Sequence, residues 1–303
     1  MARIFIDGEA GTTGLQIREK LAAVSGIELA NLPPEARKDS AAKQKLYGEV
    51  DVIILCLPDG AAKEAAHLAA DLGKSAPRVI DASSAHRVAL GWTYGFPELV
   101  EGQAKAIAKA KKVTNPGCHA TGAIALLRPL TDAGVTPREV CVSIASVSGY
   151  SGGGKAMIEA YEGGRAPAFE LYALGLEHKH MPEIERYSGL TTRPVFVPSV
   201  GNFRQGMLVS VPLHLDSLPG KPRLADLRAT FEKHYKGQKH VRVVHAGDST
   251  RLEPESLNGT NDLEIHVFAN ETRRQAVLVA KFDNLGKGAS GAAVQNLMLM
   301  LGR

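Results

Sequence analysis

The N-terminal residues place a short apolar strand directly before a glycine-rich turn that leads into a helix. Ile4 to Asp7 is the strand-like run, Gly8-Glu9-Ala10-Gly11-Thr12-Thr13-Gly14 is the turn, and Leu15 begins helical apolar spacing. Glycines at such a turn let the backbone approach a pyrophosphate, and the helix N-terminus complements its charge. The spacing G-x-x-G-x-x-G is one residue longer than the usual fingerprint, so a glycine turn without a ligand is the alternative. The position of this turn favours the first βα unit of a dinucleotide-binding sheet.

Strand-like and helical patterns alternate through the first part of the chain. Apolar runs at Val52 to Leu57 and Val79 to Asp81 alternate with helical spacing at Leu15 to Val24 and Ala61 to Leu72. Such alternation is typical of βαβ units and a parallel sheet. The predicted fold class is therefore α/β, with an N-terminal Rossmann-type parallel sheet.

Apolar residues recur with a period of two in the second half of the chain. Cys141 to Val147 has this period, as do parts of Met207 to Leu215, Leu263 to Ala269 and Gln275 to Phe282. This period predicts an α+β domain with a largely antiparallel sheet packed on one face.

A chain of 303 residues is long enough for two domains with separate cores. We expect a first domain, with the Rossmann-type sheet, at residues 1–117 and a second domain, with the largely antiparallel sheet, at residues 118–284. The C-terminal segment 285–303, with a final helix from Ala289 to Leu301, is expected to complete the first domain.

Cysteine usage and charge limit the partners of the chain. The three cysteines lack paired spacing, and we see no targeting or membrane-spanning run, so we expect a cytoplasmic protein with no membrane partner. Lys and Arg are scattered among 32 acidic residues, and only 5% of residues are aromatic, which argues against nucleic acid. A net charge of +4 suits an anionic small-molecule substrate.

Cys118 stands in the segment Asn115-Pro116-Gly117-Cys118-His119, between a strand end and the helical spacing of Ala120 to Leu130. At a helix N-terminus, unpaired N–H groups and the helix dipole favour a thiolate. The same N–H groups can hold an oxyanion formed by attack on a carbonyl. The alternative is a small buried hydrophobe, which we expect for Cys56 and Cys141 within strand patterns. The Pro-Gly elbow and the histidines downstream favour a nucleophile at Cys118.

Two histidines precede a predicted helix in Glu177-His178-Lys179-His180-Met181-Pro182-Glu183. Pro182 and Glu183 suit the first turn of that helix, so the histidines lie in the extended segment before it. A pair at i and i+2 can ligate a metal, but no further cysteine or histidine pair has ligand-like spacing nearby, so we predict no metal. A histidine, with an ordinary pKa near 6.5, can instead move the proton that cysteine chemistry requires.

The end of the second predicted strand bears on the choice of dinucleotide. A carboxylate there would accept the ribose 2′-hydroxyl of NAD and repel a 2′-phosphate. The strand ends instead in Asn31-Leu32, and Arg37-Lys38 follow, which favours NADP. Glu35 nearby weakens this inference, and solvated loop charges are the alternative.

Six motifs together resemble a known enzyme family. They are Gly8 to Gly14, Asp81-Ala82-Ser83-Ser84-Ala85-His86-Arg87, Asn115 to His119, Ser148-Gly149-Tyr150-Ser151-Gly152, His178 to Glu183, and Asn284-Leu285-Gly286-Lys287-Gly288-Ala289-Ser290-Gly291. Their order over the whole chain resembles the short form of the N-acetyl-γ-glutamyl-phosphate reductases of arginine biosynthesis. Aspartate-semialdehyde dehydrogenases share the architecture and the cysteine chemistry and are the runner-up. A dinucleotide-sensing protein without chemistry is the alternative from another class, against which Cys118 argues.

The resemblance implies an oxidoreductase that forms a thioester on Cys118 and reduces it with NADPH to N-acetyl-L-glutamate 5-semialdehyde, releasing phosphate. It implies His178 or His180 as the acid/base; we prefer His178 and expect His180 and Glu183 to bind substrate or orient the imidazole. The resemblance also implies that residues 1–117 form the NADP-binding Rossmann domain, that residues 118–284 form the catalytic and dimerisation domain, and that the chain forms a homodimer or a homotetramer.

We expect further contacts with the substrate and with the cofactor. For the substrate we expect backbone N–H groups of the Ser148 loop and the planar fork of Arg204, with a hairpin connection and a structural ion pair as alternatives. The full set of expected substrate contacts is Asn115, Ser148, Gly149, Tyr150 and Arg204. Beyond the glycine turn and Arg37-Lys38, we expect cofactor contacts at Cys56, Leu57 and Pro58. The resemblance implies further ones at Ser83, Ser84, Asn284, Gly288 and Ala289.

Overall fold

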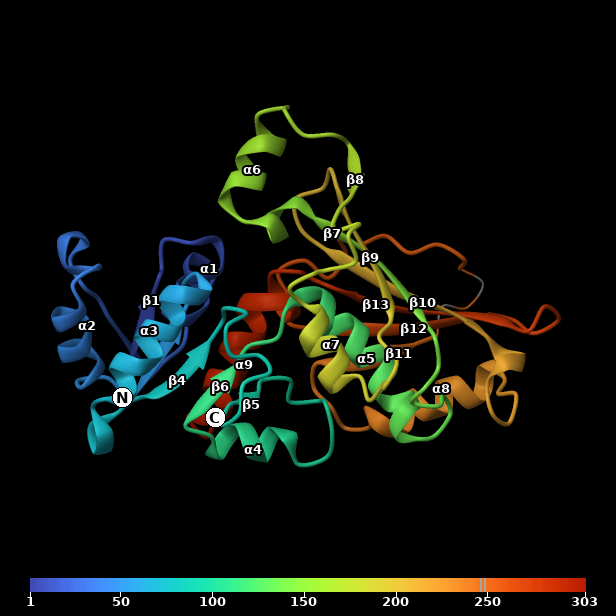
Figure 1. Ribbon diagram of the computed structural model, residues 1–303, viewed down its shortest axis with the longest axis horizontal. Coiled ribbons are helices and arrows are strands. Elements are labelled where there is room, and N and C mark those ends of the chain that lie inside the picture. The colour runs from blue at the N-terminus through green and yellow to red at the C-terminus, as the bar shows by residue number, and fades with distance from the viewer. Residues whose placement is uncertain (246, 248) are drawn as a thin grey trace. The chain divides into compact units, whose positions relative to one another are not determined.

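The computed structural model describes residues 1–245, 247 and 249–303, and the chain divides into two compact units. Each unit contains one sheet (Figure 1). The first unit comprises Met1–Pro97, Gly102–Pro116 and Ala289–Arg303, and the second comprises Glu98–Glu101 and Gly117–Gly288. The chain therefore passes between the units at several points, and Cys118 follows one of them by a single residue.

The sheet of the first unit has six parallel strands in the order β2-β1-β3-β4-β6-β5. The strands are β1 Ala2–Asp7, β2 Ile27–Ala30, β3 Val52–Leu55, β4 Arg78–Asp81, β5 Thr93–Tyr94 and β6 Lys112–Thr114. The helices are α1 Thr12–Ala22, α2 Ser40–Tyr47, α3 Asp59–Ala70, α4 Gln103–Lys109 and α9 Gly291–Met300. The predicted Rossmann-type parallel sheet is thereby confirmed.

Both faces of this sheet are covered, which explains the unbroken apolar runs of its strands. Ile4, Ile54 and Ile80 face a core shared with α1, α4 and α9. Phe5 and Ile53 point the other way, into a core with α2 and α3. The chain order reverses across β1, so the turns after β1 and β3 flank the point where ligands bind in open α/β sheets.

The second unit is built on a seven-stranded mixed sheet in the order β11-β12-β13-β10-β7-β9-β8. Pairing is parallel at β11–β12 and β7–β9 and antiparallel at the other four pairs, in keeping with the largely antiparallel sheet that we predict. The strands are β7 Ser143–Gly149, β8 Phe169–Leu171, β9 Val195–Gly201, β10 Met207–His214, β11 Val241–Val244, β12 Leu263–Asn270 and β13 Gln275–Phe282.

Two helices of the second unit, α5 and α8, contact each other and cover one face of its sheet (Figure 1). The helices are α5 Cys118–Asp132, α6 Lys155–Glu162, α7 Met181–Tyr187 and α8 Leu224–His234. Helix α7 packs on α5 rather than on the sheet. Short 3₁₀ helices occupy Pro34–Ala36, Gly73–Ser75, Tyr150–Gly153 and Leu215–Ser217, and a π-helix occupies Gly286–Ser290.

Two predictions around β7 are wrong. Strand β7 begins at Ser143, so Cys141 lies before it and is exposed rather than buried. Ser148 and Gly149 belong to β7 and lead into a 3₁₀ helix, so this segment is not the loop that we expected. The predicted final helix is present as α9, which begins at Gly291 because residues Gly286–Ser290 form a π-helical turn before it.

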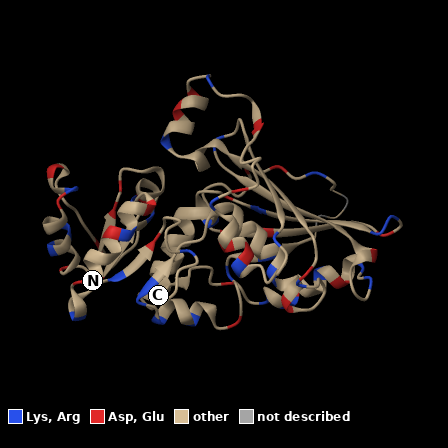
Figure 2. Ribbon diagram, viewed as in Figure 1, with Lys and Arg blue, Asp and Glu red and all other residues tan. Residues whose placement is uncertain are grey.

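Basic and acidic residues are interspersed along both units (Figure 2). Among the described residues, no helix has the length and apolar character needed to cross a membrane.

Candidate active site

Cys118 is the first residue of α5, where the sequence places it. Gly117 is the N-cap residue, with φ −80° and ψ 148°, and no side chain caps the helix start. The thiol is partly exposed, whereas nearly all of the helix after it is buried. A helix dipole and uncapped N–H groups at this point favour negative charge on the sulfur or on an oxygen beside it.

A tight turn packs directly against the nucleophile position. A Cβ atom added to Gly288 would lie 2.8 Å from Cys118 Cβ, so only glycine fits there without displacement. The Gly288 N–H donates to the Asp283 carbonyl at 3.0 Å. The Asp283 carboxylate in turn accepts from the backbone N–H groups of Gly259 and Leu285, at 2.8 and 2.9 Å. This set of bonds fixes the π-helical turn that contacts Cys118.

The carboxylate of Glu183 contacts the same elbow. Its Oε2 accepts from the Gly117 N–H at 3.1 Å, and the side chain is 1% exposed. Glu183 lies on α7, so this bond ties α7 to the start of α5. A carboxylate near a helix N-terminus is also electrostatically favourable.

His119 is fully engaged and cannot serve as an acid or base. Its Nδ1 bonds Ser146 Oγ and its Nε2 bonds Tyr172 OH, both at 2.7 Å. Burial is the main cause that lowers the pKa of His119 to about 3, so the ring is neutral. Burial first, and then the charge of Cys118, raises the pKa of Tyr172. The sequence reasoning assigned no role to His119, Tyr172 or Ser146.

The two downstream histidines lie against His119. The ring centroids of His178 and His180 lie 5.3 and 5.5 Å from that of His119 and 4.6 Å from each other. The segment before α7 is a turn rather than extended chain, because the Met181 N–H donates to the His178 carbonyl at 2.8 Å. His178 is partly exposed and His180 is 4% exposed. The described residues contain no group of three or more metal-ligating side chains.

Asn284 holds together the loops that the sequence assigns to ligands. Its Oδ1 accepts from the Gly206 N–H at 2.8 Å, and its Nδ2 donates to Ser151 Oγ at 3.1 Å. Ser148 Oγ donates to the Gly149 carbonyl at 3.0 Å. Arg204 is ion-paired with Glu162 of α6, which is the structural alternative that the sequence left open.

A buried ion pair that sequence reasoning missed lies in the same unit. Lys287 Nζ is 2.8 Å from both carboxylate oxygens of Glu98, and both side chains are about 1% exposed. Burial lowers the pKa of Lys287, and the Glu98 charge opposes that shift. The pair anchors the turn that carries Gly288, and the sequence offers no signal for it because the partners lie 189 residues apart.

In the first unit, the glycine turn fits a dinucleotide pyrophosphate. Gly8 has φ +90°, and a Cβ there would lie 2.3 Å from the Cys56 carbonyl oxygen. A Cβ on Gly14 would lie 2.7 Å from the Gly8 carbonyl oxygen. Gly11 caps α1 without a side-chain cap, so Thr12, Thr13 and Gly14 begin a helix whose first N–H groups suit a phosphate.

A cavity of about 440 Å³ lies beside this turn, within the first unit. Its lining includes Gly8 to Ala10, Leu57 and the pair Arg37 and Lys38. Glu9 bonds both Arg37, at 2.7 Å, and Arg18, at 2.6 Å, so one carboxylate is shared by two guanidinium groups. Lys38 makes no ion pair with the part of the chain that the structure describes.

Other expected ligand residues of this unit bond to their own fold. Ser83 donates to Asp81, and Ser84 donates to Asp59 through both its N–H and its hydroxyl. Asn115 Nδ2 donates to the Ala289 carbonyl at 2.9 Å.

Cys56 and Pro58 link β3 to α3. Cys56 follows the last residue of β3, and Pro58 caps α3. Burial, followed by the charges of Asp81 and Asp7, raises the pKa of Cys56 to about 12, so it stays a thiol.

The two halves of the chain match two models of one family. Residues 8–109 match the semialdehyde dehydrogenase NAD binding domain, and residues 118–284 match the semialdehyde dehydrogenase dimerisation domain. The chain is 51% identical over 305 residues to N-acetyl-gamma-glutamyl-phosphate reductase 2 of Pseudomonas putida, covering 99% of this chain and 96% of the relative. It is 52% identical over 307 residues to N-acetyl-gamma-glutamyl-phosphate reductase of Chelativorans sp., covering 99% and 98%.

Solved structures show the same fold at low identity. Aspartate semialdehyde dehydrogenase II from Vibrio cholerae superposes with a TM-score of 0.75 at 16% identity, covering 100% of this chain and 99% of that chain. Aspartate semialdehyde dehydrogenase with NADP from Candida albicans gives a TM-score of 0.68 at 12% identity, covering 99% of both chains.

Proposed function

Because the chain belongs to the family of N-acetyl-gamma-glutamyl-phosphate reductases, within the semialdehyde dehydrogenases, we propose that it reduces N-acetyl-γ-glutamyl phosphate to N-acetyl-glutamate 5-semialdehyde and phosphate. The observation that carries the proposal is the position of Cys118 at the uncapped start of α5. The Glu183 carboxylate accepts a hydrogen bond from the preceding N–H, and Gly288 lies against the Cβ of Cys118. A thiolate in this place is suited to attack on an acyl phosphate.

The chemistry follows from the residues around Cys118. The sulfur attacks the acyl carbon, the bond from that carbon to the phosphate oxygen breaks, and phosphate leaves with the electron pair. The helix N–H groups are placed to stabilise negative charge on the carbonyl oxygen. The glycine turn from Gly8 to Gly14 would hold NADPH, which when bound would supply the hydride for reduction of the thioester. Cleavage of the carbon–sulfur bond then releases the aldehyde and restores Cys118, while His178 or His180 supplies the polar contact that the oxyanion needs.

The experiment that tests this proposal follows both half-reactions. Purified protein mixed with N-acetyl-γ-glutamyl phosphate should oxidise NADPH and release one phosphate per aldehyde. An acid quench without cofactor should trap the acyl group on the peptide that contains Cys118. Acylation elsewhere, or equal reduction of β-aspartyl phosphate, would argue against it.

The cofactor is a nicotinamide dinucleotide, and we propose NADP as the form used. Arg37 and Lys38 line the cavity beside the glycine turn, and no carboxylate ends β2. The Glu9 carboxylate forms ion pairs with both Arg37 and Arg18. These three side chains together therefore carry one net positive charge. The 2′-phosphate of NADP can form ion pairs with this positive group and with Lys38. Steady-state assays with NADPH and NADH test this preference.

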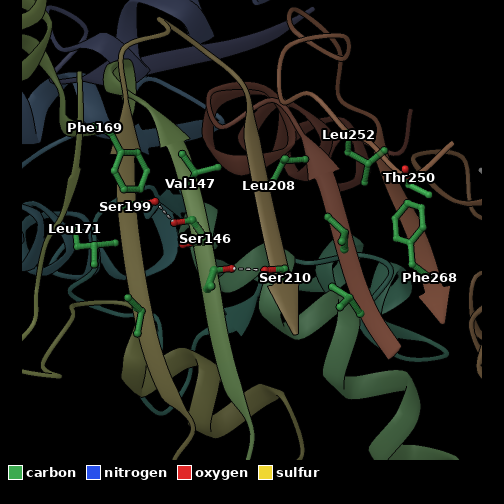
Figure 3. Close-up of a pocket in the computed structure, with 14 residues that line it drawn as sticks. Ser146, Val147, Phe169, Leu171, Ser199, Leu208, Ser210, Thr250, Leu252 and Phe268 are labelled. Atoms are coloured by element: carbon green, nitrogen blue, oxygen red, sulfur yellow. Dashed lines mark hydrogen bonds between the residues drawn. The ribbon is translucent and has the colours of Figure 1, made fainter. Parts of the chain in front are cut away.

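We further propose that the chain forms a homodimer through the open face of the second sheet. A cavity of about 700 Å³ lies on this face, and the side chains that line the cavity are mainly apolar (Figure 3). Phe169, Leu171 and Val277 are 56%, 49% and 39% exposed. Exposed apolar area of this kind marks interfaces, and the sheet lies in the segment that matches a dimerisation domain. Val277→Lys should shift sedimentation towards the monomer; an unchanged dimer would place the interface elsewhere.

A further inference from the structure

We infer that His178 acts as a neutral hydrogen-bond donor and does not carry the proton in the reaction. Its Nδ1 accepts a hydrogen bond from the backbone N–H of His180, at 3.0 Å. A backbone N–H can only donate, so this bond requires a lone pair on Nδ1. The single proton of the neutral ring therefore lies on Nε2. This inference rests on the proposed function, and it replaces the acid/base role that the sequence led us to prefer for His178.

Three edge-to-face contacts hold the plane of the His178 ring, and Tyr172 is a fourth, tilted neighbour. The ring of His178 meets the rings of His119, His180 and Phe196 edge to face, at 83°, 85° and 88°, with centroids 5.3, 4.6 and 5.3 Å away. Edge-to-face contacts at these distances are favourable. A half-turn about the Cβ–Cγ bond would place a carbon against the His180 N–H and remove its acceptor. The packing holds the plane of the ring, and the hydrogen bond decides which edge of the ring faces the His180 N–H.

This arrangement disfavours the protonated ring. An imidazolium carries a proton on each nitrogen, so its Nδ1–H would point at the His180 N–H, donor against donor. Nor can the neutral ring take up a proton at Nε2, since that nitrogen already has one. What remains is donation from Nε2–H, which can stabilise a carbonyl oxyanion or a departing phosphate oxygen without proton transfer. The proton itself must then move through another group.

The tautomer can be measured without any turnover. Long-range ¹H–¹⁵N correlation spectra of the full-length protein with labelled histidine should show an unprotonated Nδ1 and a protonated Nε2 for His178 at neutral pH. His178→Gln identifies the signal by its loss, and His214→Gln, at an exposed position of β10, serves as the assignment control. A protonated Nδ1, in either the neutral or the cationic ring, overturns the inference. Failure of the reductase assay alone would refute the proposed function but leave this result standing.

Three substitutions at one position separate donation from proton transfer. The Gln amide reaches the place of Nε2 as a neutral donor, whereas the Asn amide reaches only the place of Nδ1, and Ala reaches neither. If His178 only donates, His178→Gln should stay within about tenfold of the parent kcat, as expected for one hydrogen bond kept in altered geometry. His178→Asn and His178→Ala should fall further and equally. Loss of a proton carrier would instead cost roughly 10²–10⁴-fold in all three variants, and that result overturns the inference. Thermal unfolding of each variant checks that the fold is intact.

Discussion

Two helix starts in this molecule have nearly the same backbone and suit different chemistry. Gly11 begins α1 with φ −79° and ψ 161°, and Gly117 begins α5 with φ −80° and ψ 148°; neither helix has a side-chain cap. Both therefore present N–H groups and the positive end of a helix dipole. One suits a pyrophosphate and the other a thiolate, so the local backbone supplies the charge complementarity and the surroundings decide its use.

The surroundings differ in kind. The turn before α1 is shaped by close backbone approach, between Gly8 and the Cys56 carbonyl and between Gly14 and the Gly8 carbonyl. The start of α5 is shaped by a side chain as well, because the carboxylate of Glu183 accepts from the Gly117 N–H and the turn at Gly288 packs against Cys118. A Cβ added at Gly8 would collide with backbone, whereas the start of α5 also depends on the carboxylate side chain of Glu183.

The largest effect that this comparison predicts is at the thiol. Cys118→Ala should lower kcat by roughly 10³-fold or more, because no other side chain at that helix start can form the thioester. Binding of the dinucleotide, measured by fluorescence titration, should stay near the parent value. Cys141→Ala, at an exposed position, is the matched control and should be fully active. If Cys118→Ala retained more than a few per cent of the activity, Cys118 would not be the nucleophile.

Both helix starts could be predicted from the sequence, but the contacts around the second one could not. The glycine turn and the Cys118 elbow are contiguous, and their chemistry could be read from residue types and order. The partners of His119 could not be predicted, because Ser146 and Tyr172 lie 27 and 53 residues away and follow no pattern of spacing. A period of two shows that a strand exists but not where it begins, which is why the prediction for Cys141 was wrong.

A middle-sized effect should separate two glycines of the first turn. Gly8→Ala places a Cβ 2.3 Å from the Cys56 carbonyl oxygen at φ +90°, and should cost roughly 1–3 kcal/mol of unfolding free energy together with dinucleotide affinity. Gly11→Ala has extended φ and a nearest neighbour at 3.6 Å, so its effect should stay within about 0.5 kcal/mol. Urea unfolding and cofactor titration measure both variants. Equal effects at the two positions would mean that close backbone approach does not shape this turn.

The smallest predicted effect is on the pH dependence of folding stability, and it is expected at His119 but not at Gly8. His119 has a pKa of about 3 in the folded chain against an ordinary value of 6.5, because burial opposes its charge. Between these two values the unfolded chain binds one proton more, so folding stability falls as the pH drops below 6.5, by up to about 1.4 kcal/mol per pH unit, and is unaffected above it. His119→Gln keeps a neutral partner for Ser146 and Tyr172 but cannot titrate, so it should lose less stability than the parent between pH 6.5 and 5.5. Urea unfolding at both pH values measures the difference.

Gly8→Ala should show a pH-independent offset from the parent, because no titrating group is removed there. Parallel pH dependence of the parent and His119→Gln would show that His119 takes up its proton in the folded chain, and the site around Cys118 would then tolerate a charge that its packing opposes.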